Sequence, residues 1–386
     1  MEEMQGRGLE PAGIERLREA IASDIASGRC DGVSVCVDID GRPVFETCQG
    51  FADRRNARAL APDDVFVSFS IGKQFANTIV LSAIERGALS FLTQAADLLP
   101  CFSGSAWRGM TVAQLLTHTS GVLADAPSVP VDVLMDPARL TAFAAARGPR
   151  SAPGERVSYS TVAGHAVLSE LVRVVDGGTR DFAAIVRTEL FEPLGMKDTS
   201  LGLREDLLPR LCPVVARYEP PGLFDPHGME GFNHLLAMPG GCMPAGGYLT
   251  SSGDLRRFVR MLSNAGELDG VRILSPAMLA LCARNQTGER PDALFESVLG
   301  LRGWQPWPAC IGLGFYVRGD ALTPGPMGSL NSPGTIGGWG AGSTAFWSDP
   351  AHGVAFSLLS TGLMEDTRHM QRVQRLSDIV LSSITV

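Results

Sequence analysis

The strongest chemical signal in the sequence is a serine followed three residues later by a lysine, in Ser70-Ile71-Gly72-Lys73. On a helix, positions i and i+3 share a face, so the two side chains can hydrogen-bond. A serine hydroxyl becomes a useful nucleophile when a neighbour takes its proton, and a lysine can do so if burial or nearby positive charge lowers its pKa. Lys73 and Lys197 are the only lysines among 33 basic residues. A lysine kept against that bias can do what arginine cannot, which is to lose its proton near neutral pH.

Ser70 stands where a helix is expected to begin, since residues 70–86 have helical periodicity and Gly87 follows them. The helix dipole favours negative charge at that end, and backbone N–H groups there lack partners. The N–H of Ser70 can therefore form one half of an oxyanion hole. The competing interpretation is a surface serine that caps a helix beside a solvated lysine.

A second candidate is Tyr159, one of only four tyrosines, in the segment Tyr159-Ser160-Thr161. A phenol close to a cationic lysine is expected to have a lowered pKa and to carry a proton between nucleophile and leaving group. The competing interpretation is a partly buried tyrosine that holds a loop.

A third candidate is the glycine-rich run 337–342, Gly-Gly-Trp-Gly-Ala-Gly, directly before a predicted strand at 343–347. Glycines let a strand edge approach a ligand closely and donate N–H groups to it, which suits the second half of an oxyanion hole. Trp339 can form an apolar wall for an acyl or alcohol group. A flexible turn with a packed tryptophan is the alternative.

The elements that must position these residues can be read from periodicity. The chain opens with a helix at 11–28 and two strands joined by a turn at Asp40-Gly41. Residues 95–240 have helix-like periodicity, proline and glycine loops and no convincing alternating strand. Further helices are predicted at 255–263 and 275–283, strands at 343–347 and 353–359, and a last amphipathic helix through residues 370–380.

Because strands lie at both ends of the chain and helices between them, we expect an α/β (α+β) fold with one antiparallel sheet. The predicted sheet domain comprises residues 1–92 and 245–386. Residues 93–244 form a mainly helical inserted domain, and the active site lies between the two.

Composition excludes several function classes. The net charge is −8 and the pI is about 5.3, with no run of Lys or Arg, so nucleic acid and anionic membranes are not expected partners. No apolar run is long enough to span a bilayer, and the acidic N-terminus does not resemble a secretory signal. The eight scattered cysteines form no CxxC or zinc-like pattern and are expected to be reduced thiols in the cytoplasm. No cofactor or metal is predicted, and no signal indicates an oligomeric state.

Together these residues resemble the class C β-lactamases, DD-peptidases and β-lactamase-like (family VIII) esterases, which carry S-x-x-K, then Y-x-N, then a Gly-rich strand with Lys, His or Trp. Further segments are similar to family motifs in order and spacing over roughly residues 30–360. These segments are 111–121 (LLxHTSG), 153–160 (PG…YSN), 192–199 (PLGMxdT), 245–255 (aGGlxsTaxDla) and 311–315 (yGlGw).

The resemblance implies that Ser70 is acylated, that Lys73 and Tyr159 handle protons, and that the backbone near Ala341 or Gly342 completes the oxyanion hole. Two departures matter. The Asn of the family is Thr161 here, which makes β-lactam or peptide substrates less expected.

The second departure is that Gly338-Trp339-Gly340 replaces the Lys-Thr-Gly or His-x-Gly segment, so the cation that holds a substrate carboxylate is absent. Either Gly338 or Trp339 takes the place of that cation, and Trp339 is favoured because esterases of the family carry Trp-Gly-Gly there. The resemblance also makes His118 structural rather than a catalytic base. Neither G-x-S-x-G nor H-E-x-x-H occurs in the sequence.

The predicted function is therefore a serine carboxylesterase that acts on small or medium esters through an acyl-Ser70 intermediate, and the expected partner is a small-molecule ester or amide substrate. Three alternatives remain open at this point: an acyltransferase of secondary metabolism, an amidase or D-peptidase-type hydrolase, and a non-catalytic binding module on the same fold.

Overall fold

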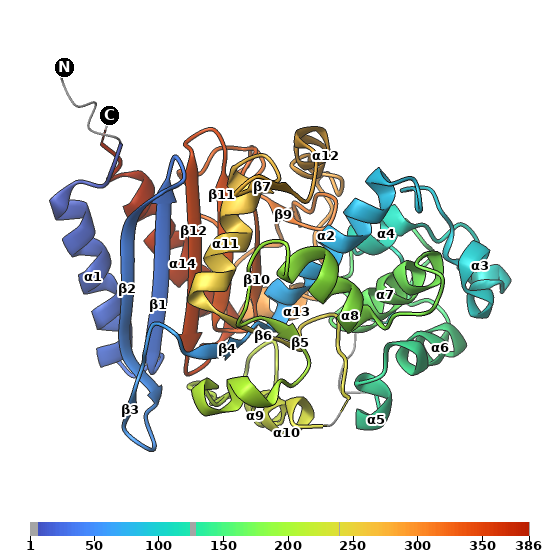
Figure 1. The fold of residues 1–386 in the computed structure, drawn as a ribbon, viewed down its shortest axis with the longest axis horizontal. Coiled ribbons are helices and arrows are strands. Elements are labelled where there is room, and N and C mark those ends of the chain that lie inside the picture. The colour runs from blue at the N-terminus through green and yellow to red at the C-terminus, as the bar shows by residue number, and fades with distance from the viewer. Residues whose placement is uncertain (1–6, 124–128, 239, 386) are drawn as a thin grey trace.

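The computed structural model describes residues 7–123, 129–238 and 240–385. Its largest element is a seven-stranded antiparallel sheet built from both ends of the chain (Figure 1). The strands follow the order β3 (Arg58–Ala59), β2 (Arg42–Asp53), β1 (Gly32–Ile39), β12 (Val354–Thr361), β11 (Thr344–Asp349), β10 (Ile336–Gly340) and β9 (Tyr316–Val317).

The two ends of the chain meet where β1 pairs with β12, from Gly32 opposite Thr361 to Ile39 opposite Val354. Alternate residues of β1 point to one face, where α1 (Pro11–Ala26) and α14 (Asp366–Leu381) cover them. The other face is covered by α11 (Ser252–Ser263), which crosses in front of the sheet in Figure 1. The mixed α/β class and the sheet built from both chain ends are confirmed.

The remaining helices lie mostly beside the sheet, on the right of Figure 1. They are α2 (Gly72–Glu85), α3 (Ala95–Leu98), α4 (Val112–Leu116), α5 (Val131–Leu134), α6 (Pro137–Arg147), α7 (Ala163–Val175), α8 (Phe182–Val186), α9 (Pro226–Glu230), α10 (Phe232–Leu236), α12 (Pro276–Cys282) and α13 (Glu296–Leu299). No helix in the described ranges is both long and apolar enough to cross a bilayer. The division into domains at 92/93 and 244/245 stays a prediction.

A second, smaller sheet corrects one expectation. The segment 95–240 was predicted to contain no strand, but β5 (Ser200–Leu201) pairs with β6 (Tyr248–Ser251), which also pairs with β4 (Val65–Val67). Two residues are too few for an alternating pattern to emerge from the sequence. A short hairpin of β7 (Glu267–Leu268) and β8 (Val271–Arg272) completes the strands.

The glycine-rich run was placed before a strand, but most of it is itself a strand. Residues 336–340 form β10, and only Ala341 and Gly342 remain in the turn that leads to β11. Gly340 lets β10 lie against the chain at Phe69, because a Cβ at Gly340 would stand 2.8 Å from the Cβ of Phe69. Because Gly340 has no side chain, β10 can lie close to the segment that contains the predicted nucleophile.

Candidate active site

Ser70 lies in a short 3-10 turn, η1 (Phe69–Ile71), which runs directly into α2. The residue before it, Phe69, has φ +47°, a left-handed backbone conformation that residues other than glycine adopt rarely. Packing holds this turn in place: Gly340 contacts Phe69 from one side, and a Cβ at Gly246 would stand 2.9 Å from the Phe69 carbonyl carbon. The Ser70 side chain is presented at the start of a buried helix, and the residue itself is partly exposed.

Lys73 is almost completely buried one turn later, with 1% of its surface exposed. Its Nζ lies 3.1 Å from the Oγ of Ser70 and donates to two backbone carbonyls, those of Thr161 at 2.8 Å and Ala245 at 2.9 Å. As an ammonium ion, Lys73 also donates its third hydrogen to Ser70. When the amine is neutral, its two hydrogens satisfy the two carbonyls and its lone pair faces the serine hydroxyl. This is the arrangement that a general base for Ser70 requires.

Burial lowers the pKa of Lys73 to about 7, because the charged form loses its hydration and no carboxylate compensates it. At neutral pH a large fraction of the amine is therefore unprotonated and able to accept a proton. The lysine that stood out in the sequence by its rarity thus occupies the one kind of environment in which it differs most from arginine.

Tyr159, from the mainly helical middle segment of the chain, also lies beside Lys73. The Nζ of Lys73 lies 4.9 Å from the centre of the Tyr159 ring, and the side chain of Ser70 is close enough to the phenol to lower its pKa. The Tyr159 backbone N–H donates to Oδ1 of Asp292 at 3.0 Å, which fixes the segment. The hydroxyl, amine and phenol singled out in the sequence therefore converge.

The expected pKa of Tyr159 was wrong in direction. Burial raises the pKa of the phenol well above its ordinary value, while the nearby side chain of Ser70 lowers it and the negative charges of Asp292 and Asp366 raise it further. The sequence argument assumed a charged lysine beside the phenol, but a buried lysine with a pKa of about 7 is only partly charged. Tyr159 is therefore a neutral phenol that can donate a proton.

His118 packs behind the tyrosine and is far less suited to accept a proton. Its ring centre is 4.4 Å from that of Tyr159, and its Nδ1 accepts the Ser160 N–H at 3.1 Å. Burial, followed by the charge of Lys73, lowers the pKa of His118 to about 3. The ring is a neutral packing and hydrogen-bonding group, as the resemblance implied.

The two candidates for the second oxyanion donor, Ala341 and Gly342, differ in their surroundings. Gly342 is buried and has φ +66°, and a Cβ at this residue would stand 2.0 Å from the carbonyl oxygen of Met364. Within the described ranges, no acceptor is assigned to the N–H of Ala341, which is partly exposed and lines the same pocket as Ser70. Of the two predicted residues, Ala341 lines the cavity that also contains Ser70, which makes it the better-placed candidate for the second donor.

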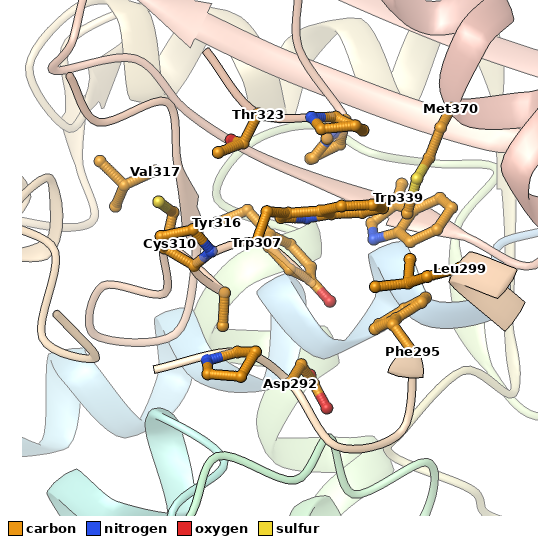
Figure 2. A pocket seen from close by; sticks show the side chains of 16 residues that line it. Asp292, Phe295, Leu299, Trp307, Cys310, Tyr316, Val317, Thr323, Trp339 and Met370 are labelled. Carbon is orange, nitrogen blue, oxygen red and sulfur yellow. The ribbon is translucent and has the colours of Figure 1, made fainter. Parts of the chain in front are cut away.

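The predicted substrate-binding run 338–340 does not line the pocket at Ser70. Gly338 faces helix α2, where a Cβ would stand 2.3 Å from Gln74, and Gly340 faces Phe69. Trp339 points to the opposite face of β10 and stacks on Phe295 at 5.5 Å (Figure 2). With Asp292 and Tyr316 it lines a separate cavity of about 40 Å³. Neither Gly338 nor Trp339 supplies the expected wall beside Ser70, because alternation along β10 turns the tryptophan away.

A larger cavity of about 350 Å³ opens at Ser70, and we call it the Ser70 pocket. Ser70, Thr161 and Ala341 lie at its base, and its walls come from α5, α9, α10 and the segments beside them. The apolar wall residues include Leu134, Val162, Phe224, Met229, Phe232 and Leu235. None of its described lining residues carries a positive charge, and its one acidic residue, Asp225, is exposed and caps α9.

Two functional candidates were missed in the sequence, Asp292 and Asp366. Both are buried, and burial raises the pKa of Asp292 to about 6 and that of Asp366 to about 7. Asp292 accepts the backbone N–H of Tyr159, and Asp366 lies close enough to the backbone N–H of Gly342 for that group to oppose the rise in its pKa. No local pattern marks an aspartate whose partner is a distant backbone amide, so periodicity could not find them.

Other predictions concern residues outside the site. Lys197 is exposed, as expected of a surface loop residue, and all eight cysteines are free thiols. No cluster of potential metal ligands occurs within residues 7–123, 129–238 and 240–385.

Comparison with known proteins agrees with this geometry. The family model described as Beta-lactamase matches residues 17–378, and the chain belongs to this family. Penicillin-binding protein 4 of Amycolatopsis lactamdurans is 31% identical over 292 residues, covering 73% of each chain. The esterase/beta-lactamase LipL of Mycobacterium tuberculosis is 25% identical over 89% of this chain and 80% of its own.

The fold is shared with a solved structure of a family VIII carboxylesterase, with a TM-score of 0.76 at 22% identity, covering 97% of this chain and 99% of the other. The protein is accordingly a hydrolase of the β-lactamase and esterase type.

Proposed function

We propose that the protein is a carboxylesterase that forms a covalent acyl ester on Ser70. The observation that carries the proposal is the coordination of Lys73, whose Nζ is held by two carbonyls and lies 3.1 Å from the Ser70 hydroxyl in a fully buried site. That arrangement gives a serine nucleophile a base with a pKa near the working pH.

Acylation begins when neutral Lys73 takes the proton of Ser70 while Oγ attacks the ester carbonyl. The carbonyl oxygen becomes an anion, which the N–H groups of Ser70 and Ala341 stabilise. Tyr159 then donates its phenolic proton to the departing alkoxide, and the phenolate recovers a proton from the Lys73 ammonium nearby. The alcohol leaves, and both proton carriers return to their neutral forms.

Deacylation repeats these steps with water in place of Ser70. Neutral Lys73 accepts a proton from the water as it attacks the acyl carbon, and Oγ of Ser70 leaves and takes up that proton from the Lys73 ammonium. The acid is released, and no step requires an electron acceptor or a further co-reactant.

The choice of an ester over a β-lactam or peptide rests on charge. Such substrates carry a carboxylate, and no described residue of the Ser70 pocket is cationic, while Asp225 stands at its rim. In the family, a side-chain amide at this position can donate an N–H. The Thr161 side chain has no N–H to donate, and Thr161 contributes its backbone carbonyl to Lys73.

The test is a comparison of initial rates with p-nitrophenyl esters, simple amides and a β-lactam, using the wild type and Ser70→Ala. We expect ester turnover that exceeds amide and β-lactam turnover by at least about 10²-fold and is lost in Ser70→Ala. Retained esterase activity in Ser70→Ala, or a preference for amides, would contradict the proposal. Added alcohols in the same assay reveal whether the acyl group is also transferred.

A further inference from the structure

The Ser70 pocket is positioned to take one particular part of an ester. The acyl carbon in the tetrahedral intermediate has four substituents: Oγ of Ser70, the oxyanion, the leaving oxygen and the acyl chain. The oxyanion must face the N–H groups of Ser70 and Ala341. The leaving oxygen must face Tyr159, which donates the proton to it.

The pocket lies on the side that remains. Ser70, Thr161, Ala245 and Ala341 belong to its base, whereas Tyr159 is not among its lining residues. Tyr159 instead packs with Phe295 and Trp339 in a separate aromatic cluster. The space next to that cluster is about 40 Å³, compared with about 350 Å³ at Ser70.

The walls of the pocket are apolar along their length. Val162 and Met229 are buried, Phe232 and Leu235 are half-buried, and Val131 at the mouth is 55% exposed. An exposed apolar side chain at the entrance of an apolar cavity is stabilised when a ligand covers it. The ring of Phe232 also packs at a tilt against that of Phe69, with ring centres 5.2 Å apart, so this wall contacts the residue that precedes Ser70.

From these observations we infer that the Ser70 pocket binds the acyl chain of the substrate, that this chain is uncharged and aliphatic or aromatic, and that α5, α9 and α10 set its length. A volume of about 350 Å³ is within the usual range for sites that enclose an organic ligand, roughly 300–1,000 Å³. The inference rests on the proposed ester hydrolysis and adds which half of the ester is recognised.

The experiment uses two series of neutral esters, one in which the acyl chain grows while the alcohol is fixed, and one in which the alcohol grows while the acyl group is butyryl. We expect kcat/KM to rise by about fourfold for each added acyl methylene until the pocket is filled, which corresponds to about 0.8 kcal/mol per buried methylene. The alcohol series should change by less than about threefold over the same range, which is less than the effect of burying a single methylene.

Two variants locate the effect. Leu235→Trp fills part of the pocket and should shorten the preferred acyl chain by at least one methylene, so that kcat/KM for long acyl chains falls relative to kcat/KM for acetate. Met229→Ala enlarges the pocket and should lengthen the preferred chain. The control is Leu322→Trp, the same change at a side chain that is 79% exposed and outside the pocket, which should leave both series unchanged.

A chain-length dependence on the alcohol side, or on neither side, overturns the inference and leaves ester hydrolysis intact. An acyl preference that Leu235→Trp and Met229→Ala do not shift also overturns it. Absence of ester turnover together with absence of acylated Ser70 overturns the proposed function, and the inference falls with it.

Discussion

The Nζ of Lys73 lies 3.1 Å from the Oγ of Ser70, and the carbonyls of Thr161 and Ala245 accept its other hydrogen bonds. This relationship fixes both the direction of the lysine and its charge. Two carbonyls orient a neutral amine toward the serine but cannot compensate an ammonium ion as a carboxylate would. Burial therefore lowers the pKa of Lys73 to about 7, as the proposed roles of nucleophile and base require.

The first prediction concerns pH. Because only neutral Lys73 can accept the Ser70 proton, kcat/KM should rise about tenfold per pH unit below about 7 and level off above it. His118, whose pKa is lowered to about 3, does not titrate in that range. Lys73→Arg should lower kcat by at least about 10² at every pH measured, because arginine does not lose its proton. A profile that stays flat from pH 5 to 9 would contradict the assignment.

The second prediction separates proton donation from positioning. Tyr159→Phe should lower kcat/KM for an alkyl ester by about 10²- to 10³-fold, because an alkoxide needs a proton to depart. A p-nitrophenyl ester, whose leaving group is a weak base, should lose much less. Tyr316→Phe is the matched control, since its ring stacks on Tyr159 at 6.4 Å. Equal losses for both esters would show that Tyr159 only positions the site.

The third prediction tests the oxyanion hole at Ala341. Ala341→Pro removes the N–H and should lower kcat by about 10²- to 10³-fold with little change in KM. Ala341→Gly keeps the N–H and should stay within several-fold of the wild type. Thermal unfolding of both variants establishes that they are folded. If a folded Ala341→Pro protein keeps wild-type kcat, the donor lies elsewhere.

The fourth prediction concerns His118. His118→Ala leaves the Ser160 N–H without its acceptor and should lower the free energy of unfolding by about 1–3 kcal/mol, measured by chemical denaturation. The remaining activity should keep its inflection near pH 7, which belongs to Lys73. Loss of that inflection in the variant would make His118 the base and contradict the present mechanism.

Much of the site could be predicted because its chemistry is local. Ser70 and Lys73 are one helical turn apart, and that spacing alone places their side chains together. Tyr159 is far along the chain, and its position followed from the family resemblance rather than from periodicity. The sheet from both chain ends followed from alternation in β1, β11 and β12, where apolar side chains cover one face.

The remainder depends on contacts that no local pattern encodes. The left-handed φ of Phe69 is imposed by packing against Gly340 and Gly246. The buried carboxyl group of Asp366 lies near the backbone of Gly342, although the two residues are 24 positions apart in the sequence. Trp339 points away from Ser70 because successive side chains of β10 alternate between the two faces of the sheet. The prediction of a lowered pKa for Tyr159 was wrong for a related reason. Burial raises the pKa of the phenol by more than the partly neutral Lys73 could lower it.

The most direct test of the acyl-enzyme is mass analysis of the protein quenched in acid during turnover of a p-nitrophenyl ester. The account predicts a mass increase equal to the acyl group, located on the peptide that contains Ser70 and absent from Ser70→Ala. An acyl group on another residue, or full turnover by Ser70→Ala without an adduct, would contradict it.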